Sequence, residues 1–335
     1  MIHRTDPAWQ VLTWQQQLAE AFTDPDELLS YLEIDKNQLP PTASAQRKFS
    51  LRVPRWFAAR MEKGNPHDPL LRQVLPLEQE LVSSDGFLLD PVADLEQAPV
   101  PGLLQKYQGR ALLITTGACG VNCRYCFRRH YPYTRSTASR SRLSAALAYL
   151  KEATDIREVI LSGGDPLMLP DHHLQELGAA LEAIPHLRRL RIHTRLPVVL
   201  PDRLTPELTD WLTAIRLQPV MVLHANHSRE LSHRHRPALA TLGERGVTLL
   251  NQSVLLAGIN DNVQTLCDLS EKLFSVGVLP YYLHQLDRVA GAVHFEVTDQ
   301  VALELHRQMS ARLPGYLIPR LVRELVGAPS KTPLH

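Results

Sequence analysis

The sequence has only four cysteines among its 335 residues, and three of them lie together between positions 119 and 126. Small secreted proteins that depend on disulfides usually distribute many cysteines along the chain, so this pattern argues against a disulfide framework. In a reducing compartment a short cysteine cluster instead indicates metal or redox chemistry. The scarcity of cysteine therefore excludes one class of protein and marks one segment as a candidate site.

The sequence also lacks an excess of either charge, because 36 lysines and arginines balance 35 aspartates and glutamates. A protein with a net charge of +1 has no broad basic field for nucleic acid, so a charged ligand has to be met locally. No apolar run is long enough to span a membrane, and the N-terminus lacks the layout of a signal peptide. We therefore expect a cytoplasmic protein with no membrane partner and no direct nucleic-acid partner.

Short apolar runs alternate with longer amphipathic stretches from Arg110 to Leu313. The runs predict strands and the amphipathic stretches predict helices. The expected strands are 111–116, 158–162, 190–194, 219–224, 247–254 and 279–283, and the expected helices are 144–152, 172–184, 206–215, 236–245, 263–276 and 298–313. Six strand–helix repeats predict an α/β barrel or partial barrel with parallel strands, whose reactive groups follow the strand ends.

The segments on either side of these repeats have a different composition. Residues 1–100 contain a helical pattern over 7–22, a second capped helix after Asp24, and frequent prolines from position 40 onward. We expect a helical and irregular N-terminal region over 1–100, the barrel over 101–315, and a short C-terminal segment over 316–335.

Cys119, Cys123 and Cys126 form a CxxxCxxC pattern directly after the first expected strand. Three thiolates can ligate three irons of a cubane cluster and leave the fourth iron open. S-adenosylmethionine can chelate that iron, and an electron from the cluster can then break its sulfonium bond to give a radical. The alternative is a zinc-stapled binding module without enzymatic activity, but zinc needs a fourth ligand, which Cys267 or His130 would have to supply.

The segment 119–126, with the sequence CGVNCRYC, resembles the signature of the radical S-adenosylmethionine superfamily. The resemblance implies a partial (β/α)6 barrel of the TIM type and a 4Fe-4S cluster, for which we expect an external electron donor. The sequence SGGDP at 162–166 resembles the glycine-rich stretch of the superfamily that meets the methionyl group, although it is also typical of an ordinary turn. This likeness implies cofactor contacts from Gly163, Gly164 and Asp165.

Further motifs match one branch of the superfamily. GLLQKY at 102–107, CFRR at 126–129, LNQSVLL at 250–256, PYYL at 280–283 and PSKTP at 329–333 together resemble the lysine 2,3-aminomutases. The resemblance implies that Lys331 forms a Schiff base with pyridoxal 5'-phosphate, and that segment 316–335 binds this cofactor and closes the active site. Taken alone, Lys331 lies four residues from the C-terminus and would be a solvated tail lysine.

Other contacts of the family carry over to matching positions in this chain. The resemblance implies that Lys106 and Arg110 lie near pyridoxal phosphate and that Arg128 pairs with the substrate carboxylate. It also implies that Asp287 and Glu324 hold the side-chain ammonium of the substrate, and these charges suit their ligands chemically. Two positions depart from the free-lysine mutases, which commonly carry arginine where Lys106 stands and aspartate where Glu324 stands.

The resemblance implies an isomerase that converts L-α-lysine into (R)-β-lysine by a radical mechanism. The short chain and the sequences RVPR at 52–55 and MEKGNP at 61–66 resemble the branch that supplies β-lysine for modifying elongation factor P, which links it to that factor and its lysyl-ligase. A radical enzyme acting on another amino acid or on RNA remains an alternative. A second metal site is not expected from His224, His227, His233 and His235, because no carboxylate partner is evident and the first two follow a strand, where ligand contacts are expected.

Overall fold

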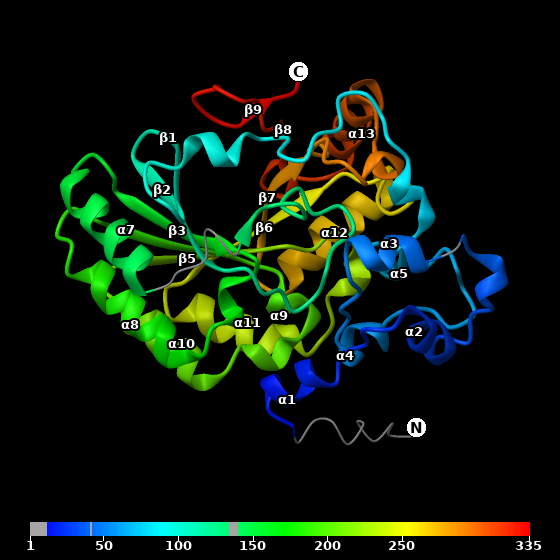
Figure 1. Ribbon diagram of the computed structural model, residues 1–335, viewed down its shortest axis with the longest axis horizontal. Coiled ribbons are helices and arrows are strands. Elements are labelled where there is room, and N and C mark those ends of the chain that lie inside the picture. Colours follow the sequence, from blue (N-terminus) through cyan, green and yellow to red (C-terminus); the bar gives the residue numbers. More distant parts are fainter. Residues whose placement is uncertain (1–11, 41, 134–139) are drawn as a thin grey trace.

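The computed structural model describes residues 12–40, 42–133 and 140–335, and its centre is one sheet of nine strands (Figure 1). The strands follow one another in chain order from β1 to β9. All pairs from β2 to β8 are parallel, whereas the first pair and the last pair are antiparallel. Within the described residues the two ends of this order do not pair, so the barrel is open. The predicted α/β partial barrel is confirmed.

Six parallel strands, each followed by a helix, form the body of the barrel. The strands are β2 (Arg110–Thr116), β3 (Glu158–Gly163), β4 (Arg189–Thr194), β5 (Gln218–Leu223), β6 (Thr248–Val254) and β7 (Leu279–His284). The helices that follow them are α7 (Arg140–Glu152), α8 (Asp171–Glu182), α10 (Pro206–Ala214), α11 (His235–Glu244), α12 (Val263–Ser275) and α13 (Asp299–Arg312). Every strand and helix expected from the apolar pattern is present at nearly the expected bounds.

The burial of these elements explains why the apolar pattern located them. Every residue of β3 is buried, as expected for a strand covered on both faces, whereas β4 alternates buried and half-buried residues. Asn262 is the N-cap of helix α12, and its side chain accepts a hydrogen bond from the backbone N–H of Thr265. The buried side chains of α12 recur at helical spacing and face the sheet. The core therefore forms between the strands and the inner helix faces.

Three further strands were not expected from the sequence. Strand β1 (Leu103–Tyr107) forms a hairpin with β2, and its turn contains Gly109 at a φ of 76°. Strand β8 (Arg320–Arg323) continues the parallel sheet beside β7, and the two-residue β9 (Thr332–Pro333) pairs back on β8. The antiparallel return brings Lys331, the residue before β9, beside the barrel, where its Nζ lies 3.3 Å from Nε2 of His284 at the end of β7.

The N-terminal region consists of short helices at one side of the barrel (Figure 1). They are α1 (Trp14–Ala19), α2 (Pro25–Tyr31), α3 (Ala43–Lys48), α4 (Arg55–Ala58) and α5 (Pro69–Arg72). A further short helix, α9 (Leu196–Val199), lies in the chain between β4 and α10. The capped helix expected after Asp24 is α2, while residues 7–11 of the first expected helix lie outside the described residues. No helix in the described ranges is long and apolar enough to cross a membrane.

Short 3-10 turns connect many of these elements. They are η2 (Lys36–Gln38), η3 (Glu78–Leu81), η4 (Asp94–Gln97), η5 (Pro166–Met168), η6 (Pro201–Arg203), η7 (Ser228–Glu230), η8 (Val293–Phe295) and η9 (Gly315–Leu317). Of these, η4 contributes a side chain to the candidate site, because it leads from the N-terminal region into β1.

Candidate active site

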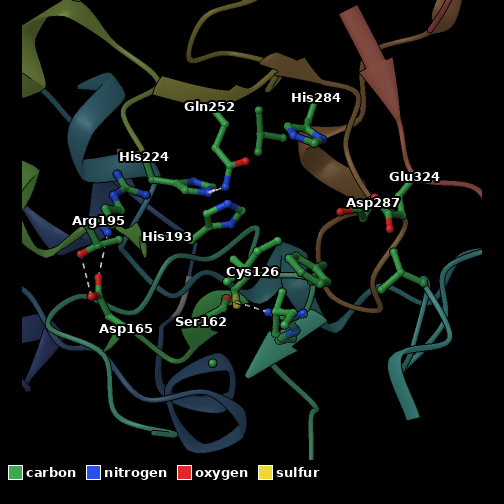
Figure 2. Close-up of a pocket in the computed structure, with 18 of the residues that line it drawn as sticks. Cys126, Ser162, Asp165, His193, Arg195, His224, Gln252, His284, Asp287 and Glu324 are labelled. Carbon is green, nitrogen blue, oxygen red and sulfur yellow. Dashed lines mark hydrogen bonds between the residues drawn. The ribbon is translucent and has the colours of Figure 1, made fainter. Parts of the chain in front are cut away.

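A cavity of about 270 Å³ lies inside the open barrel, and its walls include the last residues of β3, β4, β6 and β7. Side chains from these strand ends point into it in Figure 2. All twelve site residues predicted from the sequence line this one cavity. They are Cys119, Cys123, Cys126, Lys106, Arg110, Arg128, Gly163, Gly164, Asp165, Asp287, Glu324 and Lys331. The fold therefore gathers residues that are more than two hundred positions apart in the chain.

The three cysteines occupy the loop that follows β2. Burial, reinforced by the neighbouring cysteines, raises the pKa of Cys126 to about 11 and the pKa of Cys119 well above its ordinary value. These thiols are therefore protonated until a metal displaces their protons. Arg195 Nη1 lies 2.9 Å from Cys123 Sγ, so a buried cation faces the position where a thiolate would form. This donor set fits an iron–sulfur cluster.

The zinc alternative fails on its fourth ligand. Cys267 is buried in the apolar cluster of α12 and α13, and His130 directs Nε2 to the carbonyl oxygen of Ala290 at 3.0 Å. Neither residue lines the cavity that holds the three cysteines. Within the described part of the chain, no three histidine, cysteine or acidic side chains converge on one metal ion. The cysteine loop is therefore not a closed four-ligand zinc site.

The glycines after β3 permit close packing against the cysteine loop. Gly163 has a φ of 129°, and a Cβ atom there would lie 2.4 Å from the carbonyl oxygen of Thr116. A Cβ atom on Gly164 would lie 2.3 Å from the carbonyl oxygen of Ala118. The backbone N–H of Gly164 donates to Thr116 at 2.7 Å. Only glycine allows this approach, which holds the cysteine loop against the end of β3.

Asp165 ties the end of β3 to the end of β4. Its carboxylate accepts hydrogen bonds from the Thr194 hydroxyl at 2.7 Å and from the backbone N–H groups of Arg195 at 2.7 Å and Leu196 at 2.8 Å. Figure 2 shows Asp165 directed toward Arg195. The side chain thus has a scaffold role in this structure, and the cofactor contact implied by the resemblance stays a prediction.

A chain of buried ion pairs lines part of the cavity. Arg128 Nε donates to Asp94 Oδ2 at 2.6 Å, and Arg128 Nη1 donates to the Ser162 hydroxyl at 3.1 Å. Lys106 Nζ lies 2.7 Å from Asp94 Oδ1 and 3.5 Å from Glu324 Oε1. Burial alone raises the pKa of Asp94, but Arg128 and Lys106 outweigh it and hold that pKa below its ordinary value. Asp94 was not predicted from the sequence, because it lies in an irregular segment without periodicity.

Beyond Lys106, the chain of ion pairs that starts at Arg128 ends at two acids and one ammonium. Lys331 Nζ lies 3.2 Å from Glu324 Oε2 and 3.3 Å from His284 Nε2, and Tyr107 donates its hydroxyl to Glu324 Oε1 at 2.7 Å. Removal from solvent raises the pKa of Asp287 to about 6, and Lys331 only partly offsets this effect. Asp287 and Glu324 lie beside one another in Figure 2. The arrangement suits a ligand that carries a positive charge.

Neutral imidazoles form the wall between these two ends. Burial, followed by nearby cations, lowers the pKa of His224 to about 3, and burial first of all lowers the pKa values of His193 and His284 well below the ordinary range. The His224 ring contacts the side-chain amide of Gln252, and Figure 2 shows His193 next to this pair. The sequence analysis predicted no role for His193 or His284.

The four histidines between positions 224 and 235 have separate surroundings. His227 Nδ1 accepts a hydrogen bond from the backbone N–H of Arg229 at 3.1 Å, and His235 Nδ1 accepts one from Ser232 at 2.9 Å. Only His224 of the four histidines lines the cavity. The rings of His227 and His235 bind backbone groups around η7 and the start of α11, and His233 is exposed, so these side chains do not converge on one point.

Comparison with known proteins agrees with this geometry. Residues 113–269 match the Radical SAM superfamily. The chain is 52% identical over 322 residues to the L-lysine 2,3-aminomutase of Escherichia coli, covering 96% of this chain and 94% of that protein. It is 48% identical over 319 residues to the Haemophilus influenzae L-lysine 2,3-aminomutase (95% and 94% covered) and 33% identical over 332 residues to the Clostridium subterminale L-lysine 2,3-aminomutase (98% and 79% covered). The chain therefore belongs to the lysine 2,3-aminomutase family of the radical SAM superfamily.

Proposed function

We propose that this protein is an L-lysine 2,3-aminomutase, an isomerase that converts L-α-lysine into (R)-β-lysine. The observation that carries the proposal is one cavity in which a radical-type cysteine triad, a buried arginine and two acids face one another. These groups match the requirements of a radical reaction on a substrate with a carboxylate at one end and an ammonium at the other. Relatives with the same named activity at 52% and 48% identity support it.

Cys119, Cys123 and Cys126 hold the 4Fe-4S cluster in this proposal. A cluster with bound S-adenosylmethionine supplies a carbon-centred radical after it receives an electron from an external donor. The protein's own contribution is the loop that presents the three thiols, together with Gly163 and Gly164, which let this loop pack on β3. Arg195 adds a buried positive charge beside Cys123.

Lys331 is the residue we propose for covalent attachment of pyridoxal 5'-phosphate. That cofactor, when bound, supplies a conjugated ring that delocalises an unpaired electron. Pairing of β9 with β8 directs the Lys331 amine into the cavity, where it can meet an aldehyde. Lys106 and Arg110 are proposed to face the phosphate, and both line the same cavity. Residues 316–335 then act as the cofactor-binding segment that closes the site.

Arg128 is proposed to bind the substrate carboxylate, while Asp287 and Glu324 bind the side-chain ammonium. A guanidinium offers more N–H donors than Asp94 and Ser162 take from Arg128, so donors remain for a second carboxylate. At the other end, the tyrosine hydroxyl occupies Oε1 of Glu324 and leaves Oε2 for an ammonium. The two ends of the cavity thus distinguish the two ends of lysine.

We further infer that the product serves elongation factor P, to which a lysyl-ligase would attach the β-lysine in the cytoplasm. The support is the resemblance of segments 52–55 and 61–66 to the branch with that role. Turnover on free lysine, compared with turnover on lysylated elongation factor P, decides whether the amino group migrates before or after attachment. Rapid turnover of free lysine supports migration before attachment.

An anaerobic assay tests the proposed activity. The reconstituted protein is incubated with L-lysine, S-adenosylmethionine, pyridoxal phosphate and a reductant, and the products are separated by chromatography. We expect (R)-β-lysine, and its absence at full cluster and pyridoxal occupancy would contradict the proposal. Borohydride reduction and mass mapping should label Lys331. A radical enzyme that acts on another amino acid or on RNA would leave Lys331 unlabelled.

A further inference from the structure

The ammonium of Lys331 lies where the proposed substrate would place its own ammonium. Lys331 Nζ is 3.2 Å from Glu324 Oε2, and the side-chain exposures of the two residues are 23% and 13%. A lysine side chain of the protein and a lysine substrate end in the same primary ammonium on the same aliphatic stem. The structure therefore shows directly which carboxylate oxygen accepts such a group.

Glu324 is fixed so that only one of its oxygens is open to this group. Tyr107 donates its hydroxyl to Oε1 at 2.7 Å, and Lys106 Nζ lies 3.5 Å from the same oxygen. The Arg110 guanidinium stacks 4.5 Å from the centre of the Tyr107 ring and limits its movement. Oε2 is left as the acceptor for an ammonium, and Lys331 takes it.

We propose that Lys331 and the ε-ammonium of the substrate occupy Glu324 Oε2 in turn, so that the substrate site opens only after Lys331 has been drawn away. The identity of the second occupant rests on the proposed function. Condensation with the pyridoxal aldehyde draws Lys331 away: the ammonium loses a proton to solvent, the amine nitrogen bonds to the aldehyde carbon, and the aldehyde oxygen leaves as water. Oε2 of Glu324 then lacks its ammonium partner and accepts the ε-ammonium of the substrate.

Simultaneous occupancy is disfavoured by charge. The charged groups that line this end of the cavity are Lys106, Arg110, Lys331, Asp287 and Glu324. Lys106 and Lys331 already place two ammonium groups 3.5 Å and 3.2 Å from the carboxylate oxygens of Glu324, and Asp94 offsets only the charge of Lys106. A third ammonium at Oε2 would stand within a few ångströms of Lys331, where like charges repel strongly because the site is partly removed from solvent. The cavity therefore binds lysine well only in the form that carries the pyridoxal, which prevents unproductive binding to the cofactor-free protein.

The test measures lysine binding to the full-length, cluster-reconstituted protein without pyridoxal phosphate, by isothermal titration calorimetry. We expect Lys331→Met to bind L-lysine at least about tenfold more tightly than the unaltered protein, because the competing ammonium is gone. Lys331→Arg is the matched control: it keeps a cation and should bind lysine as weakly as the unaltered protein. L-norleucine, which lacks the ε-ammonium, should bind equally to all three proteins.

A second substitution ties the gain to Glu324. Adding Glu324→Gln to Lys331→Met should abolish the gain, and Lys331→Gln replaces Lys331→Met if circular dichroism shows that the methionine variant is unfolded. Equal lysine affinity with and without the Lys331 ammonium, or an equal gain for norleucine, overturns the inference. Product formation by the pyridoxal-loaded protein is measured in parallel: β-lysine without the gain refutes the inference alone, and the gain without β-lysine refutes the proposed function alone.

Discussion

Arg128 donates through Nε to Asp94 Oδ2 at 2.6 Å, and the two side chains are only 9% and 1% exposed. The pair joins the cysteine loop to η4 in the N-terminal region, because Arg128 follows Cys126 by two positions. Asp94 also holds Lys106 on β1. One carboxylate thus fixes two cations that face the cavity and offsets part of their charge.

Substitution of Asp94 by asparagine should destabilise the fold. Asp94→Asn keeps the shape of the side chain but leaves Arg128 and Lys106 buried without their counterion. Breaking a buried ion pair typically costs about 3 kcal/mol or more, so the free energy of unfolding should fall by about 3 kcal/mol. Urea titration of the cofactor-free protein, followed by circular dichroism, measures this change.

The control for this substitution removes an acid of the same charge at the surface. Glu304 pairs with Arg307 on α13, and both side chains are largely exposed. Glu304→Gln should leave the urea midpoint unchanged, since exposed pairs contribute little. Equal midpoints for the two variants would show that burial of Asp94 does not make its ion pairs important.

The pKa of Asp287 predicts how stability depends on pH. Burial raises it from 3.8 to about 6, so the folded protein binds the proton more tightly than the unfolded chain. This contribution to stability is complete below the unfolded pKa and is lost as the pH rises through about 6. As the pH rises from about 4 to about 7, the free energy of unfolding of Asp287→Asn should therefore rise by roughly 3 kcal/mol relative to that of the unaltered protein. Urea titrations across this range measure it.

Glu324 supplies a control of opposite sign. Its pKa is lowered, because Lys331, the Tyr107 hydroxyl and Lys106 outweigh the effect of burial. Its contribution is present above the unfolded pKa and is lost as the pH falls through the folded pKa. Relative to the unaltered protein, Glu324→Gln should therefore lose stability as the pH rises. Parallel curves for the two variants would contradict the assignment of either acid.

Iron content tests the roles of the cysteines one at a time. Cys119→Ser, Cys123→Ser and Cys126→Ser should each lose most of the iron and the brown colour of the anaerobically reconstituted protein, because each removes one thiolate ligand. Cys267→Ser is the matched control, since Cys267 lies in the apolar cluster of α12 and α13. Loss of iron on substitution of Cys267 alone would place the cluster elsewhere.

The apolar pattern predicted the barrel because burial drives it directly. Runs such as 158–162 are apolar throughout since β3 is covered on both faces, and α12 shows its buried face at helical spacing. Strands β1, β8 and β9 escaped prediction because they lie at or next to the sheet edges, are short, and are at most partly buried. The pairing of β8 with β7 also joins segments on either side of α13, so no local pattern records it.

The same distinction applies to the site. The cysteines were predicted from their local spacing and Lys331 from the family resemblance of the segment around it, and the structure brings them to one cavity. Asp94 was missed because its importance arises only when η4 meets the cysteine loop, in a contact between residues 34 positions apart. The histidines from 224 to 235 show the opposite case. They are close in sequence, but the turn at η7 and the start of α11 point their rings at different backbone groups.

Tyr107 should affect substrate binding more than turnover. Its hydroxyl donates to Glu324 Oε1 at 2.7 Å, and burial raises the pKa of Tyr107 above its ordinary value, so the hydroxyl stays protonated and continues to donate. Tyr107→Phe releases Glu324 from its orientation, and a lost hydrogen bond to a charged group predicts a KM for lysine about tenfold higher with a much smaller change in kcat. Steady-state kinetics of β-lysine formation separate the two constants.

Tyr149→Phe is the control for this prediction. It removes a tyrosine hydroxyl bond of similar length, which runs from α7 to Gln105 on β1, the strand that also carries Tyr107. Tyr149 donates to Gln105 Oε1 at 2.5 Å, and neither residue lines the cavity. General weakening of β1 would raise KM in both variants, whereas misorientation of Glu324 raises it only in Tyr107→Phe. A fall in kcat for Tyr107→Phe at unchanged KM would instead mean that the hydroxyl acts on the reacting part of the substrate and not on its ammonium.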